Sequence, residues 1–350
     1  MIHNPYYSTQ TQGPYQLHDI GDFVLDEGGT IRGCKLGYTT HGKLNAAKSN
    51  AVLVPTWYSG THQIMEQVYI GKDHALNPER YFIVVVNQIG SGISSSPHNT
   101  AFPAGMANFP KVRIGDDVRA QHRLLTEKFE IESLALVVGG SMGAQQTFEW
   151  AVRYPEMVER AAPIAGTAKN SVHDFLFTET LVEAITSDPG WNGGWYASNF
   201  DVRHGLHRHA KLWAVMGWSP AFFSRQRFRA LGFSSLEDFT TNFMNGYFGV
   251  MDPNDLLCMA WKWQRGDVSR LTGGDLAAAL GRVRAKTFVM PIETDMFFPP
   301  SDCEAEQKLI PNSELRVIHT PDGHLGLFGT DPEYIGQVDR HLRDLLSTAV

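Results

Sequence analysis

The sequence predicts an α/β fold with a mostly parallel, doubly wound sheet and a helical lid inserted into it. Short apolar runs alternate with segments of helical periodicity over most of the 350 residues, as in sheets whose parallel strands are joined by helices. One strand–helix junction carries the motif Gly139-x-Ser141-x-Gly143. Six of the eight tryptophans fall in one third of the chain, where strand signals are few.

The first elements form one edge and the centre of the predicted sheet. Residues 23–25 and 31–38 flank an Asp-Glu-Gly-Gly segment, whose residue types favour a hairpin turn. Residues 51–55 and 81–86 are short apolar runs, as expected for strands buried on both faces. Residues 116–128 have the spacing of a helix that lies against such a sheet.

The later elements alternate in the same way. Strands are predicted at 134–138, 161–164, 286–292 and 315–319, and helices from Ala144 onward and over 334–346. The tryptophan-rich segment has no clear strand, which indicates a mainly helical insertion. The predicted organisation is therefore a first part of the core at 1–166, a helical lid at 167–284 and a second part of the core at 285–350.

Composition excludes several classes of protein. The net charge is −7, 43% of residues are hydrophobic and 19% are charged, which is ordinary for a globular protein with a buried core. No basic block suggests nucleic acid or an anionic membrane as a partner. No apolar run reaches the roughly 18 residues of a membrane span, and no secretory signal opens the chain. Cys34, Cys258 and Cys303 are too widely spaced for a zinc knuckle. We expect a cytoplasmic protein.

The Ser141 motif is typical of a nucleophile elbow. A serine on a strained strand–helix turn needs small residues two positions before and after it. The helix that follows directs free N–H groups at the site, where they can stabilise an oxyanion. The alternative is a glycine-rich turn without chemistry, and the position of the motif between a strand and a helix disfavours it.

A serine nucleophile needs a base, and the base needs an orienting acid. In doubly wound hydrolases the order along the chain is serine, acid, histidine, with the partners on loops after later strands. Asp295 follows the apolar run 286–292, and His324 follows the next strand. Glu293 is an alternative acid, whereas Asp322 is too close in sequence to His324. We favour Asp295.

Two backbone N–H groups are expected to form an oxyanion hole. The first belongs to Met142, the residue after the nucleophile. The second comes from the loop "PTWYSGTH" that follows strand 51–55, and it belongs to Tyr58 or, as the alternative, to Trp57.

The segment "RHGLHRH" contains His204, His207 and His209, which could suggest a metal site. The neighbouring Arg203 and Arg208 disfavour a cation. We therefore expect a solvated helix or loop there, and neither a metal nor an organic cofactor in the protein.

Several longer segments occur in a fixed order. They are "NQIGSG" after strand 81–86, "DDVRAQ" from residue 116, "GGSMGAQQTFEWAVRYPEMV" around Ser141, "AI..DP.W..G.Y" over 184–196, "TDMFFPP" over 294–300 and "DGH" over 322–324. Together they resemble the homoserine O-acetyltransferase family of α/β-hydrolase-fold proteins over almost the whole chain. The resemblance implies a triad of Ser141, Asp295 and His324, a helical lid, and a homodimer joined through lid helices.

The chain departs from that family at two polar anchors. The family's Arg-Gln-Ala-Ile, whose arginine binds the carboxylate of the amino acid, is replaced by Val182-Glu183-Ala184-Ile185. Valine cannot form a bidentate clamp. The aspartate that follows the family's catalytic histidine is replaced by Leu325. An unpaired charge in such a pocket would cost several kcal/mol, so the amino-acid pocket is predicted to be lost.

The predicted function is hydrolysis of short-chain esters, acetyl esters above all, by a serine carboxylesterase that forms an acyl-enzyme. Val182, Leu325 and Trp57 are predicted to line an apolar substrate pocket. The alternative is an O-acetyltransferase that uses acetyl-CoA and homoserine or another alcohol. A third possibility, a binding protein without catalysis, is disfavoured by the ordered triad.

Overall fold

The core is an eight-stranded sheet with the order β1-β2-β4-β3-β5-β6-β7-β8. A computed structural model of the chain describes residues 1–349. β1 and β2 form the predicted hairpin, β2 runs antiparallel to β4, and all later pairs are parallel. The strands are β1 (Gln16–Val24), β2 (Thr30–His41), β3 (Ala51–Pro55), β4 (Phe82–Val86), β5 (Leu136–Gly140), β6 (Arg160–Ile164), β7 (Lys286–Val289) and β8 (Ser313–Leu315).

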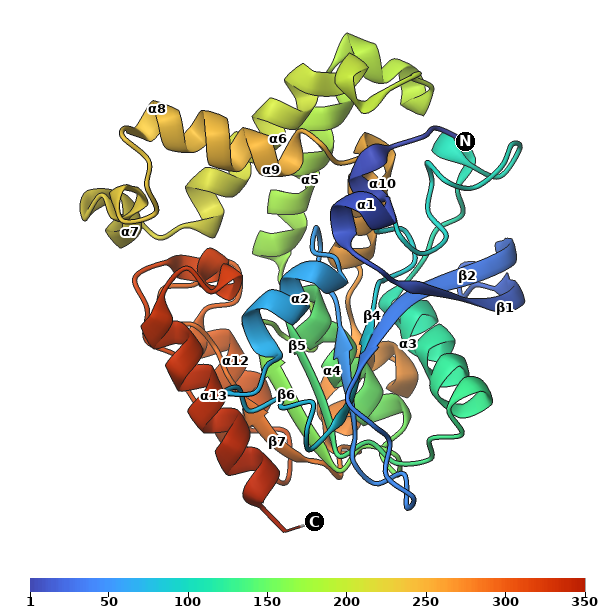
Figure 1. Cartoon of the computed structure of the whole chain (residues 1–350), viewed down its shortest axis with the longest axis vertical. Helices are drawn as coiled ribbons and strands as arrows, with labels where there is room; N and C mark the ends of the chain where they lie inside the picture. Colours follow the sequence, from blue (N-terminus) through green and yellow to red (C-terminus); the bar gives the residue numbers. More distant parts are fainter. Residues whose placement is uncertain (350) are drawn as a thin grey trace.

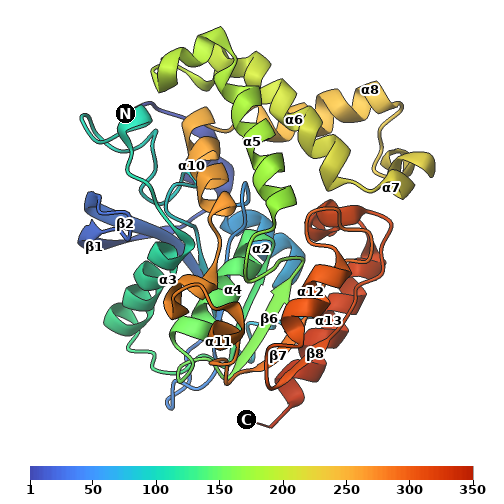
Figure 2. The same cartoon turned by 180° about the vertical axis from the view of Figure 1, so that it is seen from behind.

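Helices cover both faces of this sheet because its central strands are apolar on both sides. Successive side chains of a strand point to opposite faces. Leu53 of β3 accordingly belongs to a core shared with α3 (Ile114–Arg123) and α4 (Met142–Arg153). Val54 belongs to a second core shared with α2 (His62–Tyr69) and α13 (Pro332–Ser347). Figure 1 shows α2 and α13 on the near face, and Figure 2 shows the opposite face. The predicted doubly wound α/β fold is confirmed.

The chain between β6 and β7 is helical, and it lies above the sheet in Figure 1. α5 packs against both α6 and α10. The predicted lid range, 167–284, encloses all of these helices. They are α5 (Val172–Thr186), α6 (Arg203–Gly217), α7 (Pro220–Ser224), α8 (Leu236–Phe239), α9 (Gly246–Phe248), α10 (Pro253–Gln264) and α11 (Leu276–Leu280). The chain returns to the core at β7, and α12 (Pro300–Gln307) then joins β7 to β8.

The predicted strand at 315–319 is wrong in its bounds, since β8 ends at Leu315. Beyond it, only an isolated bridge joins Ile318 to Ile292. Pro291 separates β7 from Ile292. Proline has no N–H to donate to a neighbouring strand, so the regular pairing stops there. The predicted helix over 116–128 also changes form, because a π-helical segment replaces the α-helix from Leu124. Among residues 1–349, no helix combines the length and apolar character needed to cross a membrane.

Candidate active site

Ser141 occupies a sharp turn between β5 and α4. Its backbone has φ 55° and ψ −123°, a conformation that is strained for a residue with a side chain. A Cβ atom at Gly139 would lie 2.4 Å from the Gly143 carbonyl oxygen, and one at Gly143 would lie 2.6 Å from that of Pro55. Both glycines are therefore required for β5, α4 and the end of β3 to approach one another closely.

The structure brings Ser141, His324 and Asp295 into one hydrogen-bonded chain. The Ser141 Oγ lies 2.9 Å from His324 Nε2, and His324 Nδ1 lies 2.7 Å from Asp295 Oδ2. Asp295 Oδ1 accepts hydrogen bonds from the N–H groups of Phe297 at 2.8 Å and Phe298 at 3.2 Å. The carboxylate therefore accepts the Nδ1 proton, which leaves Nε2 free to accept the Ser141 proton. This is the geometry of a nucleophile and an oriented general base.

The alternative acids are engaged elsewhere. Glu293 is exposed, and its carboxylate lies 3.1 Å from His319 Nδ1. Asp322 forms an ion pair with Arg227 and accepts a hydrogen bond from Thr330. Neither carboxylate contacts the His324 ring.

A small cavity lies beside the Ser141 hydroxyl. Its volume is about 10 Å³, no more than the space that one water molecule needs. Trp57 and Leu325, both predicted for the pocket, are among its lining residues. The complete lining is Trp57, Tyr58, Ser59, Ser141, Trp213, His324, Leu325, Leu327 and Phe328. Apart from Ser141, His324, the Tyr58 and Ser59 hydroxyls and the indole N–H groups of Trp57 and Trp213, these side chains are apolar.

Sequence reasoning missed four lining residues: Ser59, Trp213, Leu327 and Phe328. The two last follow His324 by three and four positions, so helical spacing after the histidine could have indicated them. Trp213 packs against the His324 ring with centroids 6.3 Å apart. Of the six lid tryptophans, it alone lines the cavity in the described chain, and nothing in the sequence distinguished it from the others.

Val182 is not among the residues that line this cavity, in contrast to the prediction. It lies half-buried on α5. Phe177 of the same helix packs against Trp213 and Phe297 near the triad. Five residues of helix correspond to a rotation of about 140°, so Val182 points away from the direction that Phe177 takes. The rotation of α5 about its own axis therefore explains why Val182 does not line the cavity.

The expected oxyanion donors are Met142 and either Tyr58 or Trp57. Met142 is the first residue of α4, where a helical N–H has no partner within the helix. Trp57 and Tyr58 both line the cavity. The Tyr58 side chain extends into the lid, where its hydroxyl lies 3.0 Å from His209 Nε2 and 3.1 Å from the Leu256 carbonyl oxygen.

The expectation of a solvated surface around His209 is wrong. The side chain is fully buried, and burial lowers the pKa of His209 to about 3. His204 and His207 are exposed, because they lie on the side of α6 that faces away from the core. Within residues 1–349, no group of three or more His, Cys, Asp or Glu side chains is placed to hold a metal ion.

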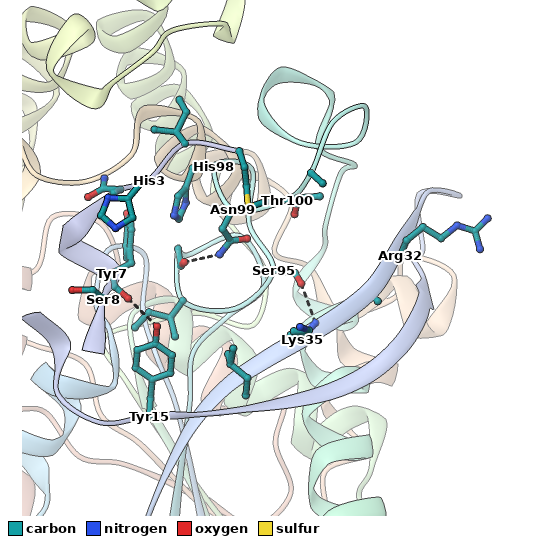
Figure 3. Close-up of a pocket in the computed structure, with 18 residues that line it drawn as sticks. His3, Tyr7, Ser8, Tyr15, Arg32, Lys35, Ser95, His98, Asn99 and Thr100 are labelled. Carbon is teal, nitrogen blue, oxygen red and sulfur yellow. Dashed lines mark hydrogen bonds between the residues drawn. The ribbon is translucent and has the colours of Figure 1, made fainter. Parts of the chain in front are cut away.

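A larger pocket, of about 670 Å³, lies between the N-terminal segment, the β1–β2 hairpin and residues 92–101 (Figure 3). His98 lines it, and its Nδ1 lies 2.6 Å from Asp255 Oδ2. Arg32, at its rim, points into solvent in Figure 3 and is paired with Asp22. No triad residue lines this pocket, and no serine is hydrogen-bonded to His98 in the described chain. Ser141 and His324 instead line the smaller cavity.

Comparison with known proteins agrees with the fold. Residues 52–329 match the family described as the α/β hydrolase fold, so the chain belongs to this family. It is 62% identical to the ethyl acetate hydrolase of Pseudomonas veronii, over 99% of each chain. The crystal structure of an acetylester hydrolase from Corynebacterium glutamicum, 59% identical, superposes with a TM-score of 0.98 and covers 99% of this chain and 100% of its own.

More distant similarity extends to the family suggested by the sequence motifs. The homoserine O-acetyltransferase of Trichormus variabilis is 30% identical, over 99% of this chain and 98% of its own. The chain thus groups with the esterases of the family more closely than with the acyltransferases. The predicted class, a carboxylic ester hydrolase, is confirmed.

Proposed function

We propose that the protein hydrolyses acetyl esters of small alcohols through an acyl-enzyme on Ser141. The observation that carries this proposal is the continuous hydrogen-bonded chain from Ser141 through His324 to Asp295, beside a small apolar cavity. Relatives at 59% and 62% identity whose names specify acetyl ester or ethyl acetate hydrolysis support it.

In the proposed mechanism, His324 Nε2 removes the Ser141 proton while Oγ attacks the ester carbonyl. The oxyanion that forms accepts hydrogen bonds from the N–H of Met142 and from that of Tyr58 or Trp57. His324 then gives its proton to the departing alcohol. Water attacks the acetyl-Ser141 ester by the same route, with His324 again as the base, and acetate leaves. Asp295 holds the imidazole in the required tautomer throughout, and the reaction uses no cofactor or metal.

The cavity favours a small acyl group and an uncharged alcohol. Trp213 and Leu325 line it beside the Ser141 hydroxyl, and neither carries a charge. Leu325 has no polar atom, and Trp213 offers one indole N–H, which has no partner in the described chain. A free carboxylate or ammonium group placed there would lack an opposite charge, at a cost of several kcal/mol. Acetyl transfer from acetyl-CoA to homoserine or another alcohol is the alternative, because it shares the acyl-enzyme, and the 30% identical acetyltransferase is the observation in its favour.

A fluorophosphonate probe tests the proposed nucleophile. Mass spectrometry of the labelled, digested protein should place one phosphonyl group on the peptide that contains Ser141, and labelling should block hydrolysis of ethyl acetate. Labelling elsewhere, or full activity after labelling of Ser141, would contradict the mechanism.

We also propose that the protein is a homodimer joined through its lid. Val172 and Leu176 of α5 and Val215 of α6 expose 88%, 64% and 67% of their surface, an unusual amount for aliphatic side chains on neighbouring helices. A second copy of the chain would cover them. Sedimentation of the wild type and of a Leu176→Glu variant should give a dimer and a monomer, respectively.

A further inference from the structure

One hydrogen-bond donor at the candidate active site has no partner within residues 1–349. Trp213 lines the cavity beside Ser141, and only 2% of its surface is exposed. Its indole Nε1 is buried and forms no hydrogen bond in that part of the chain. Buried polar atoms in proteins are almost always hydrogen-bonded, so such an atom requires an explanation. At a substrate-binding site, the missing acceptor can belong to the substrate.

The neighbouring hydroxyl groups of this cavity are already engaged. The Tyr58 hydroxyl lies 3.0 Å from His209 Nε2, and the Ser59 hydroxyl lies 3.2 Å from that of Tyr247. Among the side chains that line the cavity, only that of Trp213 has a buried polar atom without a partner in the described chain. The cavity therefore offers one free side-chain donor.

The aromatic rings that surround Trp213 do not supply the acceptor. Its ring centroid lies 6.0 Å from that of Phe177, 5.7 Å from that of Phe248 and 5.3 Å from that of Phe297. Phenylalanine has no side-chain oxygen or nitrogen. Trp263, with its ring centroid 5.8 Å away, has an indole nitrogen that can only donate. An acceptor for the Trp213 N–H is therefore expected from the cavity.

The helix that carries Trp213 does not supply the acceptor either. A Cβ atom at Gly217, one turn later on α6, would lie 3.3 Å from Trp213 Cε3. In an indole ring, Cε3 and Nε1 lie on opposite edges. The edge that carries Nε1 is therefore directed away from this turn of α6.

The contact with His324 indicates which oxygen of an ester Trp213 meets. The rings of Trp213 and His324 have centroids 6.3 Å apart, and His324 Nε2 lies 2.9 Å from the Ser141 Oγ. In the proposed mechanism the carbonyl oxygen of the ester turns to backbone N–H groups. The alkoxy oxygen must instead reach His324, which protonates it as the alcohol leaves. The alkoxy oxygen is thus the one that comes close to Trp213.

We infer that the Trp213 Nε1–H group donates a hydrogen bond to the alkoxy oxygen of the ester, and that Trp213 thereby makes the site selective for oxygen esters over thioesters. The inference rests on the proposed function, since it concerns the same site. When the bond between the acyl carbon and this oxygen breaks, the electron pair goes to the oxygen, which takes the proton of His324. Trp213 keeps its own proton, and its hydrogen bond strengthens as charge develops on the oxygen.

A thioester presents sulfur in place of the alkoxy oxygen. Sulfur is a weak acceptor, so an acetyl thioester gains little from the Trp213 N–H. The selection therefore acts against acetyl thioesters as acyl donors and favours esters of small alcohols.

The test compares ethyl acetate with S-ethyl thioacetate, which differ only in the atom that faces Trp213. Trp213→Phe keeps an aromatic ring and removes the N–H. In this variant, the ratio of kcat/KM for ethyl acetate to kcat/KM for S-ethyl thioacetate should fall about five- to tenfold, the effect of one hydrogen bond. The ratio is informative because a change in packing affects both substrates alike.

Trp263→Phe is the matched control. Trp263 is fully buried, and its Nε1 also has no partner in the described chain. It packs against Trp213 but is not among the residues that line the cavity. The variant loses the same part of the ring close to the site, and its ratio should stay within twofold of that of the wild type.

A second variant covers the case in which Trp213→Phe does not fold. 3-Benzothienylalanine at position 213 keeps the shape of the indole and replaces the N–H with sulfur, so the ratio should fall by the same factor. A folded variant of Trp213 whose ratio stays within twofold of wild type would overturn the inference, even if both substrates react more slowly. An equal fall of the ratio in Trp263→Phe would also overturn it.

The wild-type protein decides the proposed function separately. If it neither hydrolyses ethyl acetate nor is labelled by a fluorophosphonate at Ser141, the proposed function fails, and the inference fails with it. If the wild type does both and the Trp213 variants keep its ratio, only the inference fails.

Discussion

At the scale of single residues, the hydrogen-bonded chain of Ser141, His324 and Asp295 could be predicted because each residue follows a strand that the sequence marks clearly. Ser141 lies between a buried strand and a helix, and Asp295 and His324 follow the last two apolar runs. Carboxyl ends of parallel strands meet at one edge of the sheet, so these positions were expected to converge. Val182 could not be placed in this way, because its direction depends on how α5 is rotated against the core.

Removing the nucleophile tests the role of Ser141. Ser141→Ala should abolish ethyl acetate hydrolysis and keep the fold, because a methyl group fits where the hydroxyl lies. The double variant with His324→Ala should be little worse than either single variant, since the two residues act as a unit. Residual activity above a trace in purified, folded Ser141→Ala would mean that another group attacks the ester.

The acid can be tested by a paired substitution. Asp295→Asn should lower kcat by several orders of magnitude with little change in thermal stability, because the amide no longer favours the required tautomer of His324. Glu293→Gln is the matched control, since Glu293 contacts His319 rather than His324. Equal effects in steady-state kinetics of the two variants would contradict the assignment of Asp295.

At the scale of elements, the sequence predicts the strands and helices well, but not the way in which the lid is attached to the core. Apolar runs located β3, β4, β5 and β6 because these strands are buried on both faces. The contact between His209 of α6 and Tyr58 after β3 joins residues 151 positions apart. No local pattern indicates such a contact, and the basic neighbours of His209 suggested an exposed segment.

This lid contact should make stability dependent on acid. Burial lowers the pKa of His209 to about 3, below the roughly 6.5 of an exposed histidine. Between these two pH values the unfolded chain binds a proton at His209 that the folded chain does not bind. The stabilisation from burying neutral His209 is therefore complete above about pH 6.5 and is lost as the pH falls. The free energy of unfolding can be measured in urea between pH 6.5 and 4. In His209→Gln its slope against pH should be smaller than in the wild type by up to about 1.4 kcal/mol per pH unit.

The exposed His204 on the same helix is the control. His204→Gln should leave the slope as it is in the wild type. If His209→Gln unfolds with the wild-type pH dependence, His209 is not held neutral by burial.

At the scale of the whole molecule, the lid and core close over buried carboxyl groups as well as over the site. Asp174, at the start of α5, is fully buried, and neither of its carboxyl oxygens has a hydrogen-bond partner in the described chain. Burial raises the pKa of Asp174 to about 8. Nothing in the sequence distinguishes this aspartate from an ordinary first-turn residue, since its burial depends on the lid packing against the core.

Asp174 should therefore make the folded protein less stable as the pH rises from about 4 to about 8. Because its pKa is raised in the folded state, its contribution to stability is present below about pH 4 and is lost as the pH rises towards 8. Asp174→Asn should narrow the difference in Tm between pH 5 and pH 8, measured by calorimetry. Asp73→Asn, at an exposed position, should leave that difference unchanged, and an unchanged difference in Asp174→Asn would show that the carboxyl group is ionised at pH 5.

The central claim concerns the reaction that this closed apolar site performs. The most direct measurement compares kcat/KM for ethyl acetate and for O-acetylhomoserine, and assays acetyl transfer from acetyl-CoA to homoserine with the same purified protein. We predict that ethyl acetate is preferred about a hundredfold or more, because the charged groups of O-acetylhomoserine would remain unpaired in the cavity, and that transfer to homoserine is undetectable. A clear preference for O-acetylhomoserine, or rapid acetylation of homoserine, would contradict the account.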